Sequence, residues 1–276
     1  MHCMALWRKT ADRLRGGTAA VIMFIVLLLS IGSAVWLVHA RTVLPARQGR
    51  EILLQMRRQG LSHYWQPQRI TDIFVARDKT GRVIGKMETS RWASDGKFNG
   101  RTEMEFSGKR IVEGWALDDK LASGQYATDV IGDPSGPVRT VISLQGGTVS
   151  VAQEKLSGAR RADAPAGDLY LPEGSLHLAA RLVAAGGHRA AFRIIVDRTA
   201  IEAGSKVNFT DVSMVPLSRR EVRVEYRVNW VPQSQIYRFD KNGDVEEISD
   251  PDGDFRFLRT RRLVDEPPAE AGGAAI

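Results

Sequence analysis

The chain has 276 residues, of which 43% are hydrophobic and 26% charged, so it can bury a substantial core outside any membrane segment. Its single cysteine, Cys3, excludes an intramolecular disulfide and a cysteine-based metal cluster. The net charge of +7 is compatible with nucleic acid as a partner, with an anionic membrane surface, or with no specific partner.

An apolar run at residues 17–38 follows a short basic head, residues 1–16. An α-helix rises about 1.5 Å per residue, so roughly 20 apolar residues span a hydrocarbon core of about 30 Å. Trp36, His39 and Arg41 lie where an interfacial border is expected. We therefore expect a single-pass signal-anchor in the cell (inner) membrane, with the C-terminal domain extracytoplasmic. The alternative is a signal peptide cleaved after Ala40, although cleaved apolar cores are usually shorter, about 7–15 residues.

Much of the excess positive charge flanks this run, which favours a membrane surface with anionic headgroups and argues against nucleic acid as the partner. The candidate membrane-surface cations are Arg8, Lys9, Arg13, Arg15, Arg41, Arg47 and Arg50. Residues 39–63 are expected to form a juxtamembrane linker whose amphipathic helix ends at Gly60. That helix either lies on the headgroups or packs on the domain that follows.

From residue 64 the hydrophobic pattern changes to a period of two, which is typical of β-strands. The strands expected before the central helix are residues 70–77, 82–89, 101–106, 111–117, 126–131, 138–144 and 148–153. A loop is expected at residues 158–167, followed by a helix at 173–185 with an apolar stripe of Leu176, Ala179, Ala180 and Val183. Strand, turn and strand recur about every ten residues, which indicates an antiparallel meander.

A second series of strands follows the helix, at residues 190–197, 207–215, 221–231, 235–239, 245–249 and 254–260. The alternation is strongest in 221–231, where it places Val222, Val224, Tyr226, Val228 and Trp230 on one face. The fold class is therefore mainly β: a large curved antiparallel sheet (a half-barrel) over residues 64–262, with one or two packed helices. The Pro-, Ala- and Gly-rich tail, residues 263–276, is expected to be disordered.

The sequence contains only weak evidence for a catalytic or metal-binding site. Asp240, Asn242 and Asp244 have the spacing of calcium ligands, but the glycine and glutamate that such a loop requires later are missing, so a turn is the preferred interpretation. The histidines His177 and His188 make only a weak metal site. Nucleophile-elbow, phosphate-loop and dinucleotide motifs are absent. We expect no enzymatic activity, no cofactor and no metal.

Three stretches carry a resemblance to a known group of proteins: the alternating strand 221–231, the segment 234–244 and the helix start 171–176. The chain resembles bacterial extracytoplasmic β-rich domains of unassigned function. These are similar to the half-barrel domains of lipoprotein carriers and to domains that precede transglutaminase-like domains. The resemblance implies a curved sheet around helices, and no catalytic residues.

Two functions remain open. In the first, the domain is a membrane-anchored binding module for a lipid, an acyl chain or an envelope protein, with Val222, Val224, Tyr226, Val228 and Trp230 lining the concave sheet. In the second, the domain is a non-catalytic structural or assembly scaffold of the cell envelope. A carrier requires an open apolar cavity, whereas a scaffold has its concavity filled.

Overall fold

The computed structural model describes residues 24–106, 108–132, 136–202, 205–228 and 230–265. It divides into two compact units, residues 1–44 and 45–276, which are described separately. In the first unit, residues 24–38 are helical and a π-helical turn, η1 (His39–Val43), follows. The helical stretch Phe24–Gln59 contains an apolar window long enough to cross a membrane, and that window is exposed. The basic head, with Arg8, Lys9, Arg13 and Arg15, lies outside the described residues.

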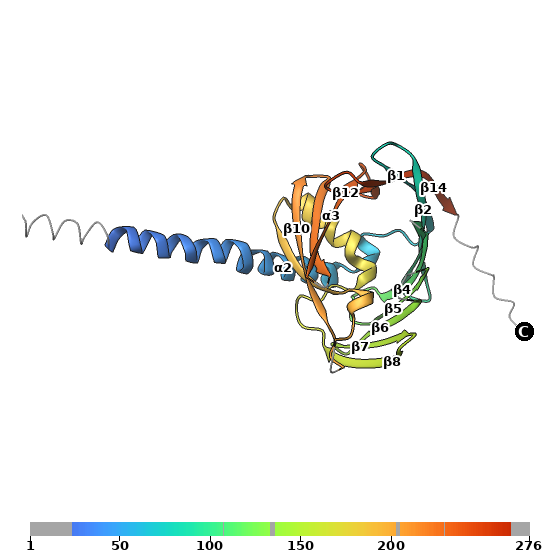
Figure 1. Ribbon diagram of the computed structural model, residues 1–276, viewed down its shortest axis with the longest axis horizontal. Coiled ribbons are helices and arrows are strands. Elements are labelled where there is room, and N and C mark those ends of the chain that lie inside the picture. Colours follow the sequence, from blue (N-terminus) through green and yellow to red (C-terminus); the bar gives the residue numbers. More distant parts are fainter. Residues whose placement is uncertain (1–23, 107, 133–135, 203–204, 229, 266–276) are drawn as a thin grey trace, which may run out of the picture. The chain divides into compact units, whose positions relative to one another are not determined.

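The second unit is built on one antiparallel sheet of 14 strands, in the order β8-β7-β6-β5-β4-β3-β2-β1-β14-β13-β12-β11-β10-β9. The expected mainly β class and curved sheet are confirmed, and the sheet curls around a helix (Figure 1) without closing on itself. Two meanders, β1 to β8 and β9 to β14, join through the pair β1–β14. In chain order the strands are β1 (Arg69–Asp78), β2 (Val83–Ser94), β3 (Lys97–Phe106), β4 (Lys109–Asp118), β5 (Gly124–Ile131), β6 (Val138–Gln145), β7 (Thr148–Lys155), β8 (Gly158–Pro165), β9 (Ala190–Ile195), β10 (Phe209–Ser218), β11 (Glu221–Val228), β12 (Val231–Phe239), β13 (Val245–Ser249) and β14 (Phe255–Asp265).

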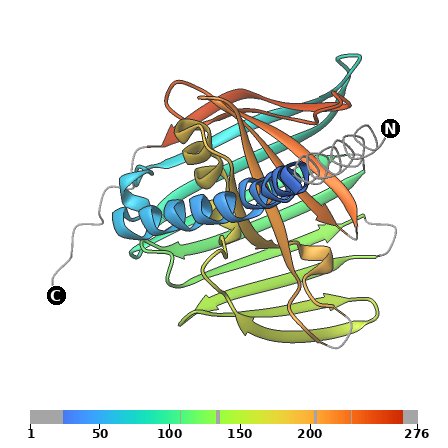
Figure 2. The same ribbon diagram turned by 90° about the vertical axis from the view of Figure 1, so that its left-hand side faces the viewer.

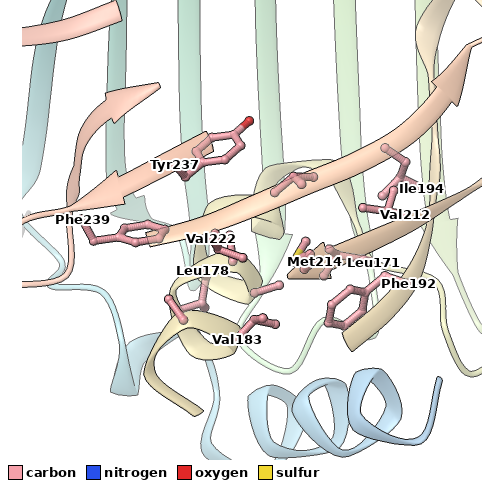
Figure 3. Packing of buried hydrophobic residues seen from close by; sticks show 14 of the residues in the cluster. Leu171, Leu178, Val183, Phe192, Ile194, Val212, Met214, Val222, Tyr237 and Phe239 are labelled. Atoms are coloured by element: carbon pink, nitrogen blue, oxygen red, sulfur yellow. The ribbon is translucent and has the colours of Figure 1, made fainter. Parts of the chain in front are cut away.

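Helix α3 (Leu176–Gly186) occupies the concave side of this sheet, preceded by the short helix η3 (Glu173–Ser175). It ends where Gly187 adopts a left-handed conformation and its N–H bonds to the carbonyl of Val183, as glycine does at many helix ends. The predicted stripe is confirmed at Ala179, Ala180 and Val183, which are buried, and its first residue, Leu176, is half-buried against the same cluster. In Figure 3, Leu178 and Val183 of α3 point toward core side chains of β9, β10 and β11.

Helix α2 (Leu44–Gln59) buries one face, formed by Pro45, Gly49, Leu53 and Met56. Leu53 and Met56 belong to the main hydrophobic cluster, so from Pro45 onward this helix packs on the domain. Gly49 allows close approach, since a Cβ added there would collide with the carbonyl oxygen of Ala191. The structure therefore supports packing on the domain over a surface helix for this segment.

Three expected boundaries are wrong. The stretch expected as a loop at residues 158–167 contains strand β8, which has few β-branched or aromatic residues and pairs with β7 through a tight hairpin. The single strand expected at 221–231 is a hairpin, because Trp230 has a φ of 69° and Val228 pairs with Val231. The last strand continues to Asp265 by pairing with β1, so the domain extends beyond residue 262.

Candidate functional site

The five side chains predicted to line a concave binding face do not surround an open cavity. Val222 and Val224 are 0% and 1% exposed and belong to the main cluster, together with residues of α3. Figure 3 shows Val222 beside this helix. Tyr226 and Val228 are half-buried. Trp230 is 89% exposed in the tight turn between β11 and β12, away from the core. The concave side of the sheet is thus filled by α3 at β11, the strand with the strongest alternation in the sequence.

A row of polar side chains instead crosses the inner face of the first meander, and we call it the polar belt. Each member is the register partner of the next on the neighbouring strand, so all share one face of the sheet. Hydrogen bonds of 3.3 Å join Thr89 to Thr102 and Gln153 to Thr140. From β14 to β7, the belt consists of Arg262, Asp72, Thr89, Thr102, Glu113, Thr128, Thr140 and Gln153.

The polar belt was not predicted from the sequence, although the sequence of β4 contains a signal for it. Glu113 has the same parity as Ile111, Trp115 and Leu117, so the alternation places a carboxyl group on the apolar face of this strand. A carboxyl group on a core-facing side requires a partner or a proton. The carboxylates of Glu103 and Glu105 on β3 lie on the opposite face of the sheet, away from Thr102 and Glu113.

One end of the polar belt enters a network of three aspartates and three arginines. Arg262 donates Nε to Oδ1 and Nη2 to Oδ2 of Asp72, both at 2.7 Å, and also pairs with Asp244. Asp244 pairs with Arg91 as well. Burial opposes ionisation of Asp244, but hydrogen bonds and charge from Arg262 and Arg91 outweigh it and lower its pKa. The remaining members are Arg259 and Asp240, which pair with each other, and Arg259 also lies 3.8 Å from Asp72.

Beside this network lies a pocket of about 50 Å³. Helix α3 contributes His177 and Arg181 to its wall, and the sheet contributes charged and aromatic side chains, among them Asp72, Arg91, Asp244, Phe74 and Phe239. A volume of this size holds a few water molecules, whereas drug-sized ligands usually occupy about 300–1,000 Å³. The pocket is therefore too small for an acyl chain.

His177 lies at the mouth of this pocket and is exposed there. The enclosing protein lowers the pKa of its imidazole to about 4, and the charge of Arg91 adds to this shift. Water that reaches the exposed ring weakens the effect, yet in either case the imidazole is neutral at pH 7. Its ring centre lies 5.3 Å from that of Tyr237. The other predicted metal candidate, His188, is exposed beyond the end of α3.

In the middle of the polar belt, Glu113 forms a cluster of three carboxyl groups with Glu173 and Asp197. Tyr170 donates to Oε2 of Glu173 at 2.9 Å, and the N–H of Ile195 donates to Oε1 at 3.1 Å. Burial raises the pKa of Glu173 to about 7 despite these bonds. Burial, and then the charges of Glu113 and Glu173, raise the pKa of Asp197.

Oδ1 of Asp197 in this cluster and Oγ1 of Thr128, the register partner of Glu113, are buried without a hydrogen-bond partner. Within the described ranges, no group of three His, Cys, Asp or Glu side chains is arranged to hold a metal ion. Burial thus shifts all three carboxyl groups toward their protonated forms, because it raises the pKa of each.

The loop with calcium-like spacing forms a turn. The side chain of Asp240 accepts the N–H groups of Asn242 at 2.8 Å and Asp244 at 3.0 Å. Both aspartates pair with arginines of the network, which occupies the oxygens that calcium would need. Of the predicted membrane-surface cations within the described residues, Arg47 pairs with Glu51 at 2.9 Å and Arg50 with Asp168 at 3.3 Å, while Arg41 is exposed.

The two edges of the sheet differ. Along β9, the N–H of Leu171 bonds to the carbonyl of Arg193 at 2.9 Å, and the N–H of Arg193 bonds to the carbonyl of Leu169 at 2.8 Å, so a chain segment covers this edge. Strand β8 pairs with β7 alone among the described strands, and its first four residues, including Arg160 and Arg161, are exposed. Figure 2 shows β7 and β8 in yellow-green at the margin of the sheet.

No family model matches the sequence, and no curated protein matches it. Among solved structures, the chain is similar to a β-barrel-like protein of the domain of unknown function DUF1849 from Brucella abortus. The identity is 10% and the TM-score 0.51, over 73% of this chain and 99% of that one. A likeness at this identity concerns the fold alone, and it agrees with a β-rich, barrel-like domain.

Proposed function

We propose that the chain is a membrane-anchored, extracytoplasmic and non-catalytic scaffold that holds a protein partner of the cell envelope on its outer surface. The observation that carries the proposal is the filled concavity: α3 packs on Val222 and Val224, and the interior pocket measures about 50 Å³. A lipid carrier built on a similar half-barrel needs an apolar interior of several hundred Å³. The polar belt adds to this argument, because buried polar groups are poor neighbours for an acyl chain.

The anchor and the compartment are parts of this proposal. They are supported by the exposed apolar window within Phe24–Gln59 and by the basic residues beside it in the sequence. A single N-terminal span ahead of a long domain usually leaves the basic N-terminus in the cytoplasm. In this proposal the C-terminal unit lies on the extracytoplasmic side of the membrane.

The surface that we assign to the partner is the edge of β8. An unpaired strand presents N–H and C=O groups to which an extended segment can add as a further strand. Arg160 and Arg161 select the occupant by charge, since they favour an acidic segment and repel a second copy of β8. The covered β9 edge offers no such opportunity.

Site-specific photocrosslinking in cells that produce the full chain tests this proposal. A crosslinker placed at Ala159 of β8 is expected to yield a discrete protein adduct that is lost in the variant Arg160→Glu/Arg161→Glu. The matched control is Arg219→Glu/Arg220→Glu, which reverses two adjacent exposed arginines in the β10–β11 turn and should leave the adduct unchanged. Native mass spectrometry of the purified chain supplies the opposing outcome: a stoichiometric acyl ligand would refute the scaffold and favour the carrier.

A further inference from the structure

Among the charged residues that line the interior pocket within the described ranges, Arg181 is the cation that has no ion-pair partner. The three aspartates and three arginines of the network balance one another in charge. Arg181 lines the same pocket from α3, one helical turn after His177, and forms no ion pair within the described part of the chain. Two arginines, Arg91 and Arg181, and two aspartates, Asp72 and Asp244, line the pocket itself. Counted with the whole network, Arg181 adds one net positive charge around the pocket.

The guanidinium of Arg181 is held in place by the turn that follows β12. Gly243 has a φ of 80°, and a Cβ added there would collide with Nε and Cζ of Arg181. The guanidinium thus lies directly on the backbone of this turn, and the side chain is half-buried. A planar guanidinium in a fixed position is well suited to hydrogen-bond a carboxylate with two parallel N–H groups.

The rest of the pocket limits what can accompany a carboxylate. Trp65, Phe74 and Phe239 supply apolar walls, and the volume of about 50 Å³ leaves space for only a few carbon atoms. A phosphate group carries more negative charge than Arg181, the one cation here without an ion pair, can balance, and it has no apolar part to place against these rings. The neutral imidazole of His177 can donate one hydrogen bond to an oxygen at the pocket mouth.

We propose that this pocket binds a short aliphatic carboxylate, with Arg181 as its ion-pair partner, His177 as a hydrogen-bond donor and the aromatic walls in contact with its carbon chain. The site lies inside the domain and is distinct from the β8 edge, so it goes beyond the scaffold function. Because so few atoms make contact, the dissociation constant should be on the order of millimolar.

Titration of the purified full chain in detergent, followed by thermal unfolding and by saturation-transfer NMR of the acid, tests this site. Sodium acetate, propionate and butyrate are expected to raise the unfolding midpoint, compared with sodium chloride at equal ionic strength. Octanoate, which exceeds the pocket, and inorganic phosphate should give no specific rise.

The variant Arg181→Gln is expected to bind propionate at least tenfold more weakly, whereas Arg220→Gln, a change at an exposed turn, should bind it like the wild type. The unfolding midpoint of Arg181→Gln without added acid reports whether this variant is folded, and His177→Ala gives a second, independent loss of affinity. The proposal is overturned if the short acids have no effect on the wild type. It is equally overturned if phosphate and octanoate act as strongly as propionate, or if Arg181→Gln responds like the wild type.

Discussion

Arg262 of β14 binds Asp72 of β1 through two hydrogen bonds of 2.7 Å, across a separation of 190 residues in the sequence. This pair spans the junction between the two meanders, and Asp72 is only 5% exposed. Asp72 and Arg262 are directly opposite each other in the antiparallel register of β1 and β14, so their ion pair reinforces that register. The polar belt therefore begins at the β1–β14 pairing, which joins the two meanders into one sheet.

Replacement of Arg262 should destabilise the domain strongly. Arg262→Met leaves the buried carboxylate of Asp72 with only the more distant Arg259, and loss of one partner of a buried pair costs about 3–5 kcal/mol. Urea denaturation measures this loss. The control is Arg101→Met, which breaks the exposed Arg101–Glu103 pair and should cost less than about 1 kcal/mol. Equal losses in the two variants would contradict the role assigned to the Asp72 pair.

Stability should fall as the pH rises through the range of Glu173. Its pKa is about 7 in the folded domain and ordinarily 4.5, so the folded state holds the proton more tightly than the unfolded chain. This contribution is fully present below pH 4.5 and is lost as the pH rises through 7. Glu113 and Asp197 shift in the same direction, whereas the lowered pKa of His177 acts in the opposite one.

The variant Glu173→Gln isolates the first of these effects. Between pH 4.5 and 8 the wild type should lose more free energy of unfolding than the variant, by up to about 3 kcal/mol. Chemical denaturation at several pH values measures the difference. Glu154→Gln, at an exposed position of β7, is the control and should parallel the wild type. A variant as sensitive to pH as the wild type would show that Glu173 is not the group responsible.

The variant Gly49→Ala should destabilise the domain, although alanine is usually more favourable than glycine within a helix. Within a helix, Gly→Ala typically stabilises by up to about 1 kcal/mol. At Gly49 the new methyl group meets the backbone carbonyl of Ala191, which cannot rotate away, so a loss of about 1–3 kcal/mol is expected. Gly186→Ala, at the end of α3 with nothing within 4 Å, serves as the comparison and should be neutral or stabilising. If both variants gain stability, α2 does not pack as described.

Glycine at position 230 should stabilise the β11–β12 hairpin. Trp230 has a φ of 69°, where residues other than glycine are strained by about 1 kcal/mol, and its 89% exposed side chain leaves little packing to lose. Thermal unfolding of Trp230→Gly should therefore show a raised midpoint. Val222→Ala, at a residue with no exposure, should instead cost about 2 kcal/mol or more. If Trp230→Gly lost as much stability as Val222→Ala, the result would favour the original prediction that Trp230 lies on the concave face.

The apolar window, the mainly β class, the central helix and most strands could be predicted from the sequence, because each depends on a local period of hydrophobic residues. The same periodicity failed at β8, where Arg160 and Arg161 interrupt the alternation and pairing with β7 alone makes the strand. It also failed at Trp230, where uninterrupted alternation hides a reversal of the chain that depends on the backbone conformation of one residue.

The candidate site depended on contacts that no local pattern contains. By itself the sequence determined which strands have a core-facing side and that Glu113 lies on one of them, since side chains alternate across a strand. Only the tertiary structure decided what that side faces: the register of successive strands aligns the polar belt, and α3 fills the concavity. The pairing of β1 with β14 then brings Asp72 to Arg262, because the free energy of a buried charge is set by partners distant in the sequence.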